Sequence, residues 1–314
     1  MDSARRTDVL IVGAGPAGIA MAIQLKRYGI HFMLFEKERV GGLLWNANLV
    51  ENYPGFPRGV SGPNLIDLFE KQMCRIGVEV VCENVVNVDR VEMVPVCGVS
   101  IVDCNNLGEF VAETSHALYR AKILVVASGT KPMPFPIPIP AEVRPHVFSD
   151  VTQLLDVTGK EIVIVGAGDA AFDHALNLGK RKNFVTILNR GRDVKCLPLL
   201  AERVKLRPEI QYEDEVTIQG LESDGTNGLI IRCQMRDSAR QIRADNLIFA
   251  IGREPQREFL SANLRAKEGD LVSTGRLYFI GDVRNGLLRQ TAIAVGDGLR
   301  AAMQIYLMPK DEII

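Results

Sequence analysis

Residues 8–37 read DVLIVGAGPAGIAMAIQLKRYGIHFMLFEK, and the same pattern returns at residues 161–190 as EIVIVGAGDAAFDHALNLGKRKNFVTILNR. The two stretches align without a gap at a constant offset of 153 residues, and eight of the thirty aligned positions are identical. Each stretch predicts an apolar strand, a glycine turn, a helix with apolar residues three and four apart, and a second strand. The chain therefore uses one βαβ unit twice.

The glycines indicate what each unit can bind. In the pattern G-x-G-x-x-G the first glycine allows a sharp turn, the second lets a pyrophosphate approach the backbone, and the third small residue lets the helix pack on the strand. The phosphates then lie at the helix N-terminus. A glycine loop alone is a weak signal, but here each loop follows a strand, opens a helix and is followed by a second strand. We therefore expect two dinucleotide sites.

The ends of the two second strands differ. Glu36 lies 21 residues after the second glycine of its loop, where an acidic side chain can accept hydrogen bonds from a ribose hydroxyl pair. The matching residue of the second unit is Asn189, and Arg190, Arg192 and Lys195 follow it as a cluster that suits a 2′-phosphate. We predict FAD in the first unit and NADPH, in preference to NADH, in the second. The alternative for the basic cluster is a solvated loop.

The composition is that of a soluble globular protein of about two domains. The chain has 314 residues, of which 47% are hydrophobic and 24% charged. Lys and Arg number 37 against 38 Asp and Glu, so the net charge of −1 gives no excess of either sign to drive binding to nucleic acid or an anionic membrane. We expect neither partner.

Residues 9–25 carry no charge and follow two arginines, which loosely imitates a secretory signal or a membrane span. The glycines and the proline within this stretch fit a strand, a tight turn and a helix better than one continuous helix. No other run approaches membrane length, so we predict a cytoplasmic protein.

A proline-rich stretch at residues 131–145 separates the two units, and its composition favours a semi-rigid extended connector. The strand ILVVASGT at residues 123–130 precedes it, and a similar strand, NLIFAIGREP at residues 246–255, offers the return crossing. We predict an α/β protein with two Rossmann-like nucleotide-binding domains of the three-layer ββα type, the second inserted into the first. The FAD domain would comprise residues 1–129 and 254–314, and the NAD(P)H domain residues 130–253.

The sequence resembles the low-molecular-weight thioredoxin reductase family of flavoproteins. The resemblance runs through nearly the whole chain in the family order, and the VENYPG and GD…RQ segments are more specific than the glycine loops. The matching segments are GAGPAG at 13–18, FEK at 35–37, GG at 41–42, VENYPGFP at 50–57, VSGPNL at 60–65, ASGT at 127–130, GAGDAA at 166–171, FAIGREP at 249–255, FIGDV at 279–283 and RQTAIAVGDGLRAA at 289–302.

The resemblance implies a homodimer and the binding residues of both dinucleotides. For FAD, the glycine loop would hold the pyrophosphate, Glu36 and Lys37 the adenosine, Asp282 the ribityl chain, and residues 289–291 the isoalloxazine. The expected FAD-binding residues are Gly13, Gly15, Pro16, Ala17, Gly18, Glu36, Lys37, Gly42, Leu43, Asn52, Val85, Ala127, Gly129, Gly281, Asp282, Arg289, Gln290 and Thr291. The expected NAD(P)H-binding residues are Gly166, Gly168, Asp169, Ala170, Asn189, Arg190, Arg192, Lys195 and Gly252.

A predicted helix at residues 291–307 gives an independent reason to place the flavin ring near its start. A helix N-terminus offers free N–H groups and partial positive charge, which would stabilise the anion that forms on two-electron reduction of the flavin. The alternative is an ordinary packing helix with small residues, and both can be true. Asp169 is expected to serve at the start of the second unit's helix, as an N-cap or in its first turn.

One departure from the family decides the chemistry. Thioredoxin reductases carry a redox C-x-x-C just before the strand that leads into the second glycine loop, whereas residues 146–168 here read HVFSDVTQLLDVTGKEIVIVGAG, without a cysteine. A relay of electrons to thioredoxin needs two thiols in exchange geometry. We therefore expect no thioredoxin reduction by the family mechanism. The glutathione-reductase arrangement is absent too, since residues 41–54 contain no cysteine.

The cysteines present offer no clear substitute. Cys97 with Cys104, or Cys74 with Cys82, would have to meet at the flavin from segments peripheral to it. Cys196 lies beside the basic cluster, whose charge would favour a thiolate, but it is alone. We interpret the cysteines as buried or incidental, and none forms a zinc-ligand pair. The six are Cys74, Cys82, Cys97, Cys104, Cys196 and Cys233.

The four histidines, His31, His116, His146 and His174, belong to no catalytic or metal-binding constellation in the sequence. We therefore expect no metal and no catalytic side chain beyond the flavin. The main hypothesis is an NAD(P)H-dependent FAD oxidoreductase that passes electrons to an external acceptor such as ferredoxin, flavodoxin or an iron–sulfur enzyme.

Two other functions stay open. The chain could reduce a disulfide or another small molecule bound directly against the flavin, in a pocket lined by Trp45, Tyr53 and Phe56. It could also be a flavin-binding regulatory protein whose nucleotide site no longer turns over. The intact second glycine loop and the basic residues after it argue against the regulatory alternative.

Overall fold

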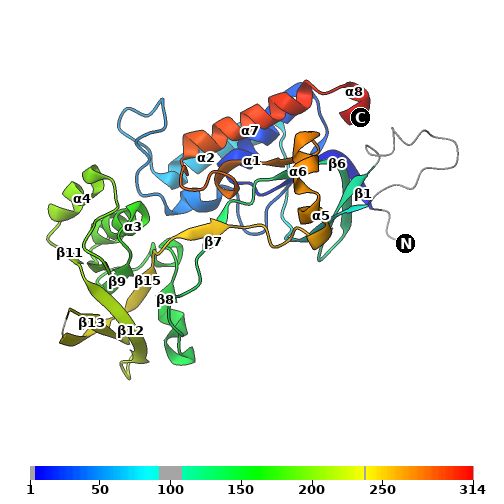
Figure 1. Ribbon diagram of the computed structural model, residues 1–314. Helices are drawn as coiled ribbons and strands as arrows, with labels where there is room; N and C mark the ends of the chain where they lie inside the picture. The colour runs from blue at the N-terminus through cyan, green and yellow to red at the C-terminus, as the bar shows by residue number, and fades with distance from the viewer. Residues whose placement is uncertain (1–3, 92–107, 237, 314) are drawn as a thin grey trace.

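The computed structural model describes residues 4–91, 108–236 and 238–313, which form two lobes, each around its own sheet (Figure 1). The strands are β1 (Arg5–Val12), β2 (Phe32–Phe35), β3 (Val80–Val81), β4 (Val85–Val91), β5 (Glu109–Thr114), β6 (Leu118–Val126), β7 (Thr130–Pro132), β8 (Val147–Phe148), β9 (Glu161–Val165), β10 (Phe184–Leu188), β11 (Ile210–Glu213), β12 (Val216–Ser223), β13 (Leu229–Met235), β14 (Ser238–Ala244), β15 (Asn246–Phe249), β16 (Arg253–Pro255) and β17 (Leu277–Phe279). The α-helices are α1 (Pro16–Tyr28), α2 (Gly62–Ile76), α3 (Asp169–Lys180), α4 (Pro198–Lys205), α5 (Ala262–Ala266), α6 (Glu268–Ser273), α7 (Thr291–Tyr306) and α8 (Lys310–Ile313). Short 3₁₀ helices are η1 (Gly42–Asn46), η3 (Ala141–His146), η4 (Thr152–Leu154) and η5 (Gly281–Val283).

The repeated sequence forms the same βαβ unit in both lobes. In the first, β1 and β2 flank α1 and pair in parallel, with Ile11 opposite Leu34. In the second, β9 and β10 flank α3 and pair in parallel, with Ile164 opposite Ile187. The prediction of two βαβ units is confirmed.

The sheet of the first lobe has seven strands in the order β3-β2-β1-β6-β5-β4, with β17 also paired to β6. β17, β6, β1, β2 and β3 are parallel neighbours, while β4 and β5 add an antiparallel extension. The sheet of the second lobe has five parallel strands in the order β11-β10-β9-β15-β8, covered on one side by the antiparallel sheet β12-β13-β14. In both sheets the first strand of the repeat lies in the interior, so its carboxyl end opens where strand order reverses, a position at which such sheets bind ligands.

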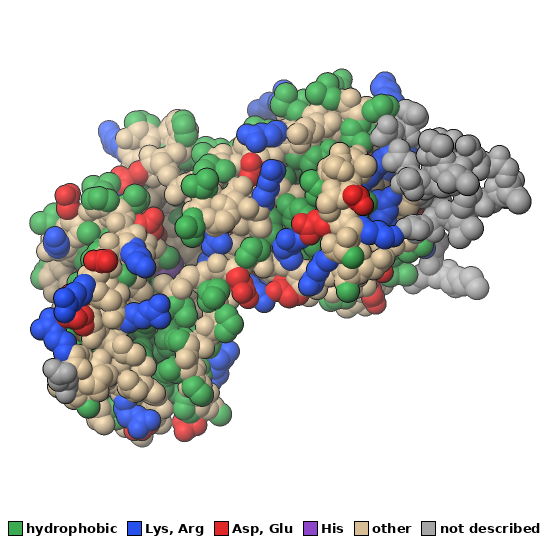
Figure 2. All heavy atoms as spheres, in the orientation of Figure 1, with side chains coloured by type: hydrophobic (Ala, Val, Ile, Leu, Met, Phe, Trp, Pro, Cys, Tyr) green, Lys and Arg blue, Asp and Glu red, His purple; other side chains and the backbone are tan. Residues whose placement is uncertain are grey.

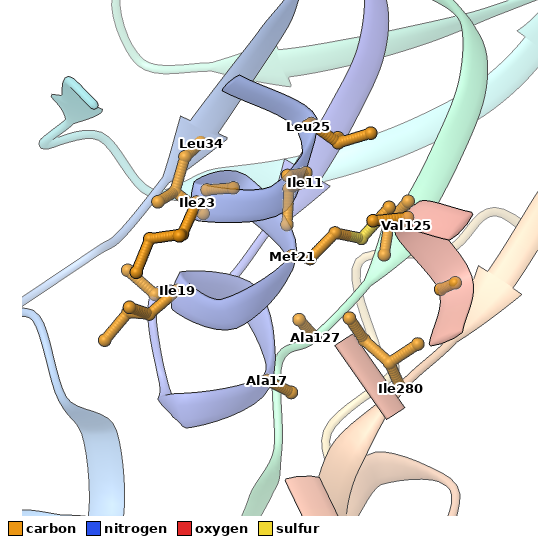
Figure 3. Packing of buried hydrophobic residues seen from close by; sticks show 14 of the residues in the cluster. Ile11, Ala17, Ile19, Met21, Ile23, Leu25, Leu34, Val125, Ala127 and Ile280 are labelled. Carbon is orange, nitrogen blue, oxygen red and sulfur yellow. The ribbon is translucent and has the colours of Figure 1, made fainter. Parts of the chain in front are cut away.

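Buried apolar side chains fill both faces of the first sheet. Ile11 of β1 and Val125 of β6 meet Met21 of α1, and Ile19 and Leu34 continue the same cluster (Figure 3). The opposite face buries a second cluster under β4, β5, α5 and α6. Helix α7 lies directly on α1. At Gly298 the two helices are so close that an added Cβ would lie 2.2 Å from the Ala17 carbonyl oxygen.

The chain passes between the lobes twice, and the two passages pair with each other. β7 leaves the first lobe and β16 returns to it, and the two strands are antiparallel with Thr130 opposite Pro255. The backbone N–H of Met133 also donates to the Gly252 carbonyl at 3.1 Å. The two passages between the lobes therefore lie side by side, at residues 130–132 and 253–255.

Charged side chains of both signs are interspersed over both lobes on the face drawn in Figure 2. Among the described residues, no helix is long and apolar enough to cross a membrane. The uncharged stretch at residues 9–25 is divided between β1, the glycine turn and α1, as the glycines predicted.

Candidate dinucleotide-binding site

The first glycine loop is a cradle that only small residues can form. Gly13 has φ +109°, and a Cβ there would lie 2.4 Å from the Ala127 carbonyl oxygen. A Cβ at Gly18 would lie 2.0 Å from the Gly13 carbonyl oxygen, so α1 starts in contact with the loop. At Gly15, by contrast, a Cβ would meet nothing within 4 Å. The open side of the loop therefore faces the N-terminus of α1, where a pyrophosphate fits.

The second loop repeats this geometry in the other lobe. Gly166 has φ +150°, and a Cβ there would lie 2.3 Å from the Ala250 carbonyl oxygen, whereas Gly168 faces open space. Asp169 begins α3 in its first turn with Gly168 as the N-cap residue, and Ala170 is exposed beside it. An Asp169 carboxylate oxygen accepts from the Leu197 N–H at 2.7 Å, which holds the loop before α4 against the glycine turn.

Glu36 lies at the end of β2, next to the first glycine loop. Its carboxylate accepts from the Ala14 N–H at 2.9 Å and from the Glu38 N–H at 3.1 Å. These bonds fix an acidic side chain at the strand end, where a ribose would approach. Lys37 is exposed and lies 3.7 Å from Glu38, and Val85, at the start of β4, is buried.

Several segments expected along the first dinucleotide meet around α1. The Gly41 N–H donates to the Ala14 carbonyl at 2.8 Å, which brings Gly42 and Leu43 of η1 against the loop. Gly281, with φ +72°, is so close to Ala17 that an added Cβ would lie 2.8 Å from the Ala17 side chain. The Asn52 side chain donates to the side-chain oxygen of Gln290, the residue before α7, at 2.8 Å.

The start of α7 carries free backbone donors. The helix begins at Thr291, and its N-cap residue Gln290 makes no side-chain capping bond. No acidic residue lies in its first turn. The uncompensated N–H groups and helix dipole therefore leave a positive end next to Asn52 and Gln290.

A charged cluster lies between this helix end and the crossing strands. Burial raises the pKa of Asp282, while Arg289 and Arg253 oppose that shift. Arg289 donates to the Arg253 carbonyl at 3.2 Å, and its buried Nε has no partner in the structure. An unpaired buried donor fits a polar ligand atom, because leaving it unsatisfied costs free energy.

Sequence reasoning missed Arg253, although the motif IGREP marks it. Its guanidinium donates to the Thr130 hydroxyl at 3.1 Å and to the Thr130 carbonyl at 2.8 Å. Burial lowers the pKa of this side chain. The neighbouring Gly252, expected in the nucleotide site, has φ +116° and lies at the crossing rather than in the second glycine loop.

The loop after β10 contains the residues that were expected to meet a 2′-phosphate, and two of them have partners within the protein. Asn189 is buried, and its side-chain NH₂ donates to the Tyr212 hydroxyl at 2.9 Å and the Asp193 carbonyl at 3.1 Å. Its side-chain oxygen accepts from the Gly191 N–H at 3.1 Å. Arg192 is not a free cation, because its Nε lies 2.8 Å from Glu215. Arg190 and Lys195 are exposed.

Two further titratable groups, half-buried Asp173 and buried His174, lie in α3. Asp173 accepts from the Asn48 N–H of the other lobe at 3.0 Å, and burial raises its pKa to about 6. Burial lowers the pKa of His174 to about 4, and its Nδ1 has no partner in the structure. The sequence pattern does not separate His174 from the other histidines, because the burial of a side chain depends on tertiary packing.

The cysteines differ in burial and in thiol pKa. The expected effect of the basic cluster on Cys196 is wrong, because burial first and the Asp169 charge second raise the pKa of this thiol. Cys233 is buried, whereas Cys74 and Cys82 are exposed. The remaining pair, Cys97 and Cys104, lies outside the described residues.

Of the three aromatic residues expected to line one pocket, two line the same hollow and one does not. A hollow of about 360 Å³ is lined by residues 51–57, among them Tyr53 and Phe56. Trp45 is not part of its lining: its Nε1 donates to the Val40 carbonyl at 2.8 Å, and Arg39 stacks on its ring at 4.2 Å. Within the described residues, no group of His, Cys, Asp or Glu could hold a metal ion.

Comparison with known proteins agrees with this architecture. A family model described as "Pyridine nucleotide-disulphide oxidoreductase" matches residues 7–298. The "34.2 kDa protein in rubredoxin operon" of Clostridium pasteurianum is 26% identical, covering 96% of this chain and 97% of that protein. The thioredoxin reductase of Mycolicibacterium smegmatis is 28% identical, covering 94% of each chain.

Solved structures have the same fold. The thioredoxin reductase of T. acidophilum superimposes with a TM-score of 0.79 at 25% identity, covering 99% of this chain and 100% of that one. The thioredoxin reductase of Lactococcus lactis, in its FR conformation, gives a TM-score of 0.78 at 22% identity, covering 95% and 97% of the two chains. The expected resemblance and the α/β fold with two Rossmann-like domains are confirmed.

Proposed function

Because the chain belongs to the pyridine nucleotide-disulphide oxidoreductase family, we propose that it is an NAD(P)H-dependent FAD oxidoreductase that serves an external electron acceptor without a dithiol of its own. Residues 1–129 and 254–314 would hold FAD, and residues 130–253 the nicotinamide nucleotide. The observation that carries the proposal is the pair of glycine loops, each with its second glycine facing open space at the start of a helix.

The chain's own residues fit FAD in the first lobe. Gly15 leaves room for the pyrophosphate, and the N-terminus of α1 supplies N–H donors to it. The Glu36 carboxylate, held by two backbone N–H groups, has lone pairs left to orient a ribose. Asp282 and the unpaired Arg289 Nε offer an acceptor and a donor toward the rest of the cofactor.

FAD, when bound, supplies hydride acceptance from a nicotinamide and release of electrons to the acceptor. The protein contributes binding, orientation and electrostatics. The start of α7 would stabilise negative charge on a reduced ring, because its free N–H groups and dipole are fixed before reaction. Arg289 and Arg253 add positive charge to the same region.

The cysteine spacing supports an acceptor other than thioredoxin. The sequence contains no C-x-x-C, so electrons have no two-thiol relay toward thioredoxin. The Clostridium relative is named for a rubredoxin operon, which supports a small iron protein as the class of acceptor. Ferredoxin and iron–sulfur enzymes are the candidates of that class, and flavodoxin, which carries a flavin instead of iron, is the candidate outside it.

A second candidate is reduction of a small disulfide bound directly at the flavin. The hollow lined by residues 51–57 favours it, because Asn52 in its lining is hydrogen-bonded to Gln290 beside the expected flavin ring. Tyr53 and Phe56 would supply the apolar contacts.

An anaerobic titration of the purified flavoprotein with NADPH and NADH tests the proposal. We expect one or both nucleotides to bleach the flavin absorbance, and Gly168→Ala to lose that bleaching while keeping the bound flavin. Reoxidation by ferredoxin or rubredoxin supports the main proposal, and reoxidation by a low-molecular-weight disulfide supports the second. A bound flavin that neither nucleotide bleaches overturns both in favour of a regulatory protein.

We also propose a homodimer. Apolar side chains at the end of α7 support it, since Met303, Tyr306 and Leu307 are exposed. Size-exclusion chromatography with light scattering measures the mass directly, and a mass near the 34.6 kDa of one chain overturns this part of the proposal.

A further inference from the structure

Glu215 faces the basic loop that follows β10. It lies in the turn between β11 and β12, and its two carboxylate oxygens accept from Arg192 Nε at 2.8 Å and Arg236 Nε at 2.9 Å. The Glu215 side chain is 22% exposed, against 78% for Arg192. The mostly buried Glu215 carboxylate therefore holds the guanidinium of a largely exposed Arg192.

The backbone sets the position of this carboxylate. Glu215 has φ +56°, the left-handed conformation that side chains other than Gly, Asn and Asp seldom adopt. Its N–H donates to the Gly191 carbonyl at 3.2 Å, and the next N–H, of Val216, donates to the Asn189 carbonyl at 2.9 Å. These two backbone hydrogen bonds hold the turn against the basic loop, and they do not depend on the side chain at position 215.

The other two basic residues are available. Within the described residues, neither Arg190 nor Lys195 forms an ion pair, and both are exposed. The Lys195 N–H donates to the Ala167 carbonyl at 2.8 Å, which places this residue against the second glycine loop. A nucleotide bound there would lie beside Lys195, whereas the Arg192 guanidinium is already held by Glu215.

We infer that Glu215 sets the coenzyme preference of the second lobe by withholding Arg192 from a 2′-phosphate. The carboxylate competes with the phosphate for the guanidinium and adds a negative charge beside a dianionic group. Recognition of the 2′-phosphate therefore falls to Arg190 and Lys195, and the preference for a phosphorylated ribose is weaker than three basic residues would give. This inference rests on the proposed nucleotide site.

Calorimetric binding of 2′,5′-ADP and 5′-AMP to the FAD-loaded protein tests it without turnover. Glu215→Gln keeps the side-chain shape and removes the charge, and we expect 2′,5′-ADP to bind about two- to fivefold tighter, within the range of an exposed ion pair, while 5′-AMP is unchanged. Arg192→Ala should change 2′,5′-ADP binding less than about twofold in the wild type and abolish the gain in the Glu215→Gln background. Glu215→Asn, which suits the left-handed backbone, replaces the Gln variant if that protein does not fold.

Glu213→Gln is the matched control. Glu213 lies in the same region, accepts from Arg240 at 2.6 Å and makes no ion pair with Arg192, so its removal changes the charge without releasing Arg192. An equal gain in this control, no gain in Glu215→Gln, or an equal gain for 5′-AMP overturns the inference. If the wild type binds neither probe, the proposed nucleotide site itself fails, a result distinct from binding that Glu215 does not change.

Discussion

The Asp173 carboxylate accepts a hydrogen bond of 3.0 Å from the backbone N–H of Asn48, which joins α3 of the second lobe to the loop after η1 in the first. The carboxylate is half-buried at this junction, and the hydrogen bond replaces only part of its lost hydration, so its pKa rises to about 6. The contact between lobes therefore contains a group that titrates just below neutrality.

Replacing Asp173 by Asn tests this burial. A carboxyl whose pKa is higher in the folded than in the unfolded chain stabilises the fold below about pH 4, and that contribution is lost as pH rises through about 6. Asn still accepts from Asn48 but carries no charge. We expect Asp173→Asn to raise the free energy of unfolding by about 2 kcal/mol near pH 7.5, with the difference vanishing near pH 4.

Urea denaturation at several pH values measures this effect. Asp67→Asn serves as the control, since Asp67 is an exposed carboxylate on α2 paired with Lys71. A gain that does not depend on pH would contradict a titrating Asp173.

The same junction holds an ion pair. Arg203 of α4 donates to both carboxylate oxygens of Glu51, at 2.6 and 2.8 Å, and this hydrogen bonding lowers the pKa of Glu51. The stabilisation is present at neutral pH and is lost as acid protonates Glu51. Because both side chains are partly exposed, a double-mutant cycle of Glu51→Gln and Arg203→Met should give a coupling energy of about 0.5–1 kcal/mol that falls in high salt. A coupling insensitive to salt would show that the pair is more buried than its exposure indicates.

Two glycines of the first loop should differ in the property that is lost when each is replaced by Ala: stability at Gly18 and FAD affinity at Gly15. At Gly18 the new Cβ would clash with the Gly13 carbonyl oxygen, so we expect a loss of about 3 kcal/mol or more in apoprotein stability. At Gly15 the Cβ enters open space, so we expect an apoprotein that melts like the wild type and binds FAD at least about tenfold more weakly. Gly269→Ala, in α6 with nothing within 4 Å, is the neutral control. Normal flavin content in the Gly15→Ala variant would contradict binding of the FAD pyrophosphate at this loop.

Alkylation should distinguish the cysteines. Burial and the Asp169 charge raise the pKa of Cys196, so less of it is thiolate at neutral pH. We expect iodoacetamide to label exposed Cys82 before Cys196, as resolved by peptide mass spectrometry. Cys196→Ser should leave reduction of the flavin by nucleotide unchanged, and a large loss would give this thiol a role in the chemistry.

The repeated unit made most of the fold predictable. Glycines that must adopt positive φ or touch backbone, such as Gly13 and Gly166, leave a mark in the sequence because few other residues can replace them. Helix α7 was predicted over residues 291–307 and ends one residue earlier, at Tyr306.

The charge pattern of the second site was harder to predict. Arg192 looks like a phosphate ligand in the sequence, but its partner Glu215 is 23 residues away and reaches it only through the β11–β12 turn. The direction of the Cys196 shift likewise depends on burial and on Asp169, 27 residues earlier, rather than on the basic residues beside it. Such long-range pairings are set by tertiary packing, which a single sequence does not record.

The antiparallel pairing of β7 with β16 also bears on how this chain could have arisen. Thr130 and Pro255 are opposite each other, so the two ends of the intervening segment lie about 5 Å apart, within the span of a short turn. A nucleotide-binding unit could therefore be inserted into an ancestral chain, or deleted from it, at this one point without changing the strand order of the first sheet. The same point offers a place to exchange the second lobe for that of a relative and to obtain chimaeric reductases with altered coenzyme choice.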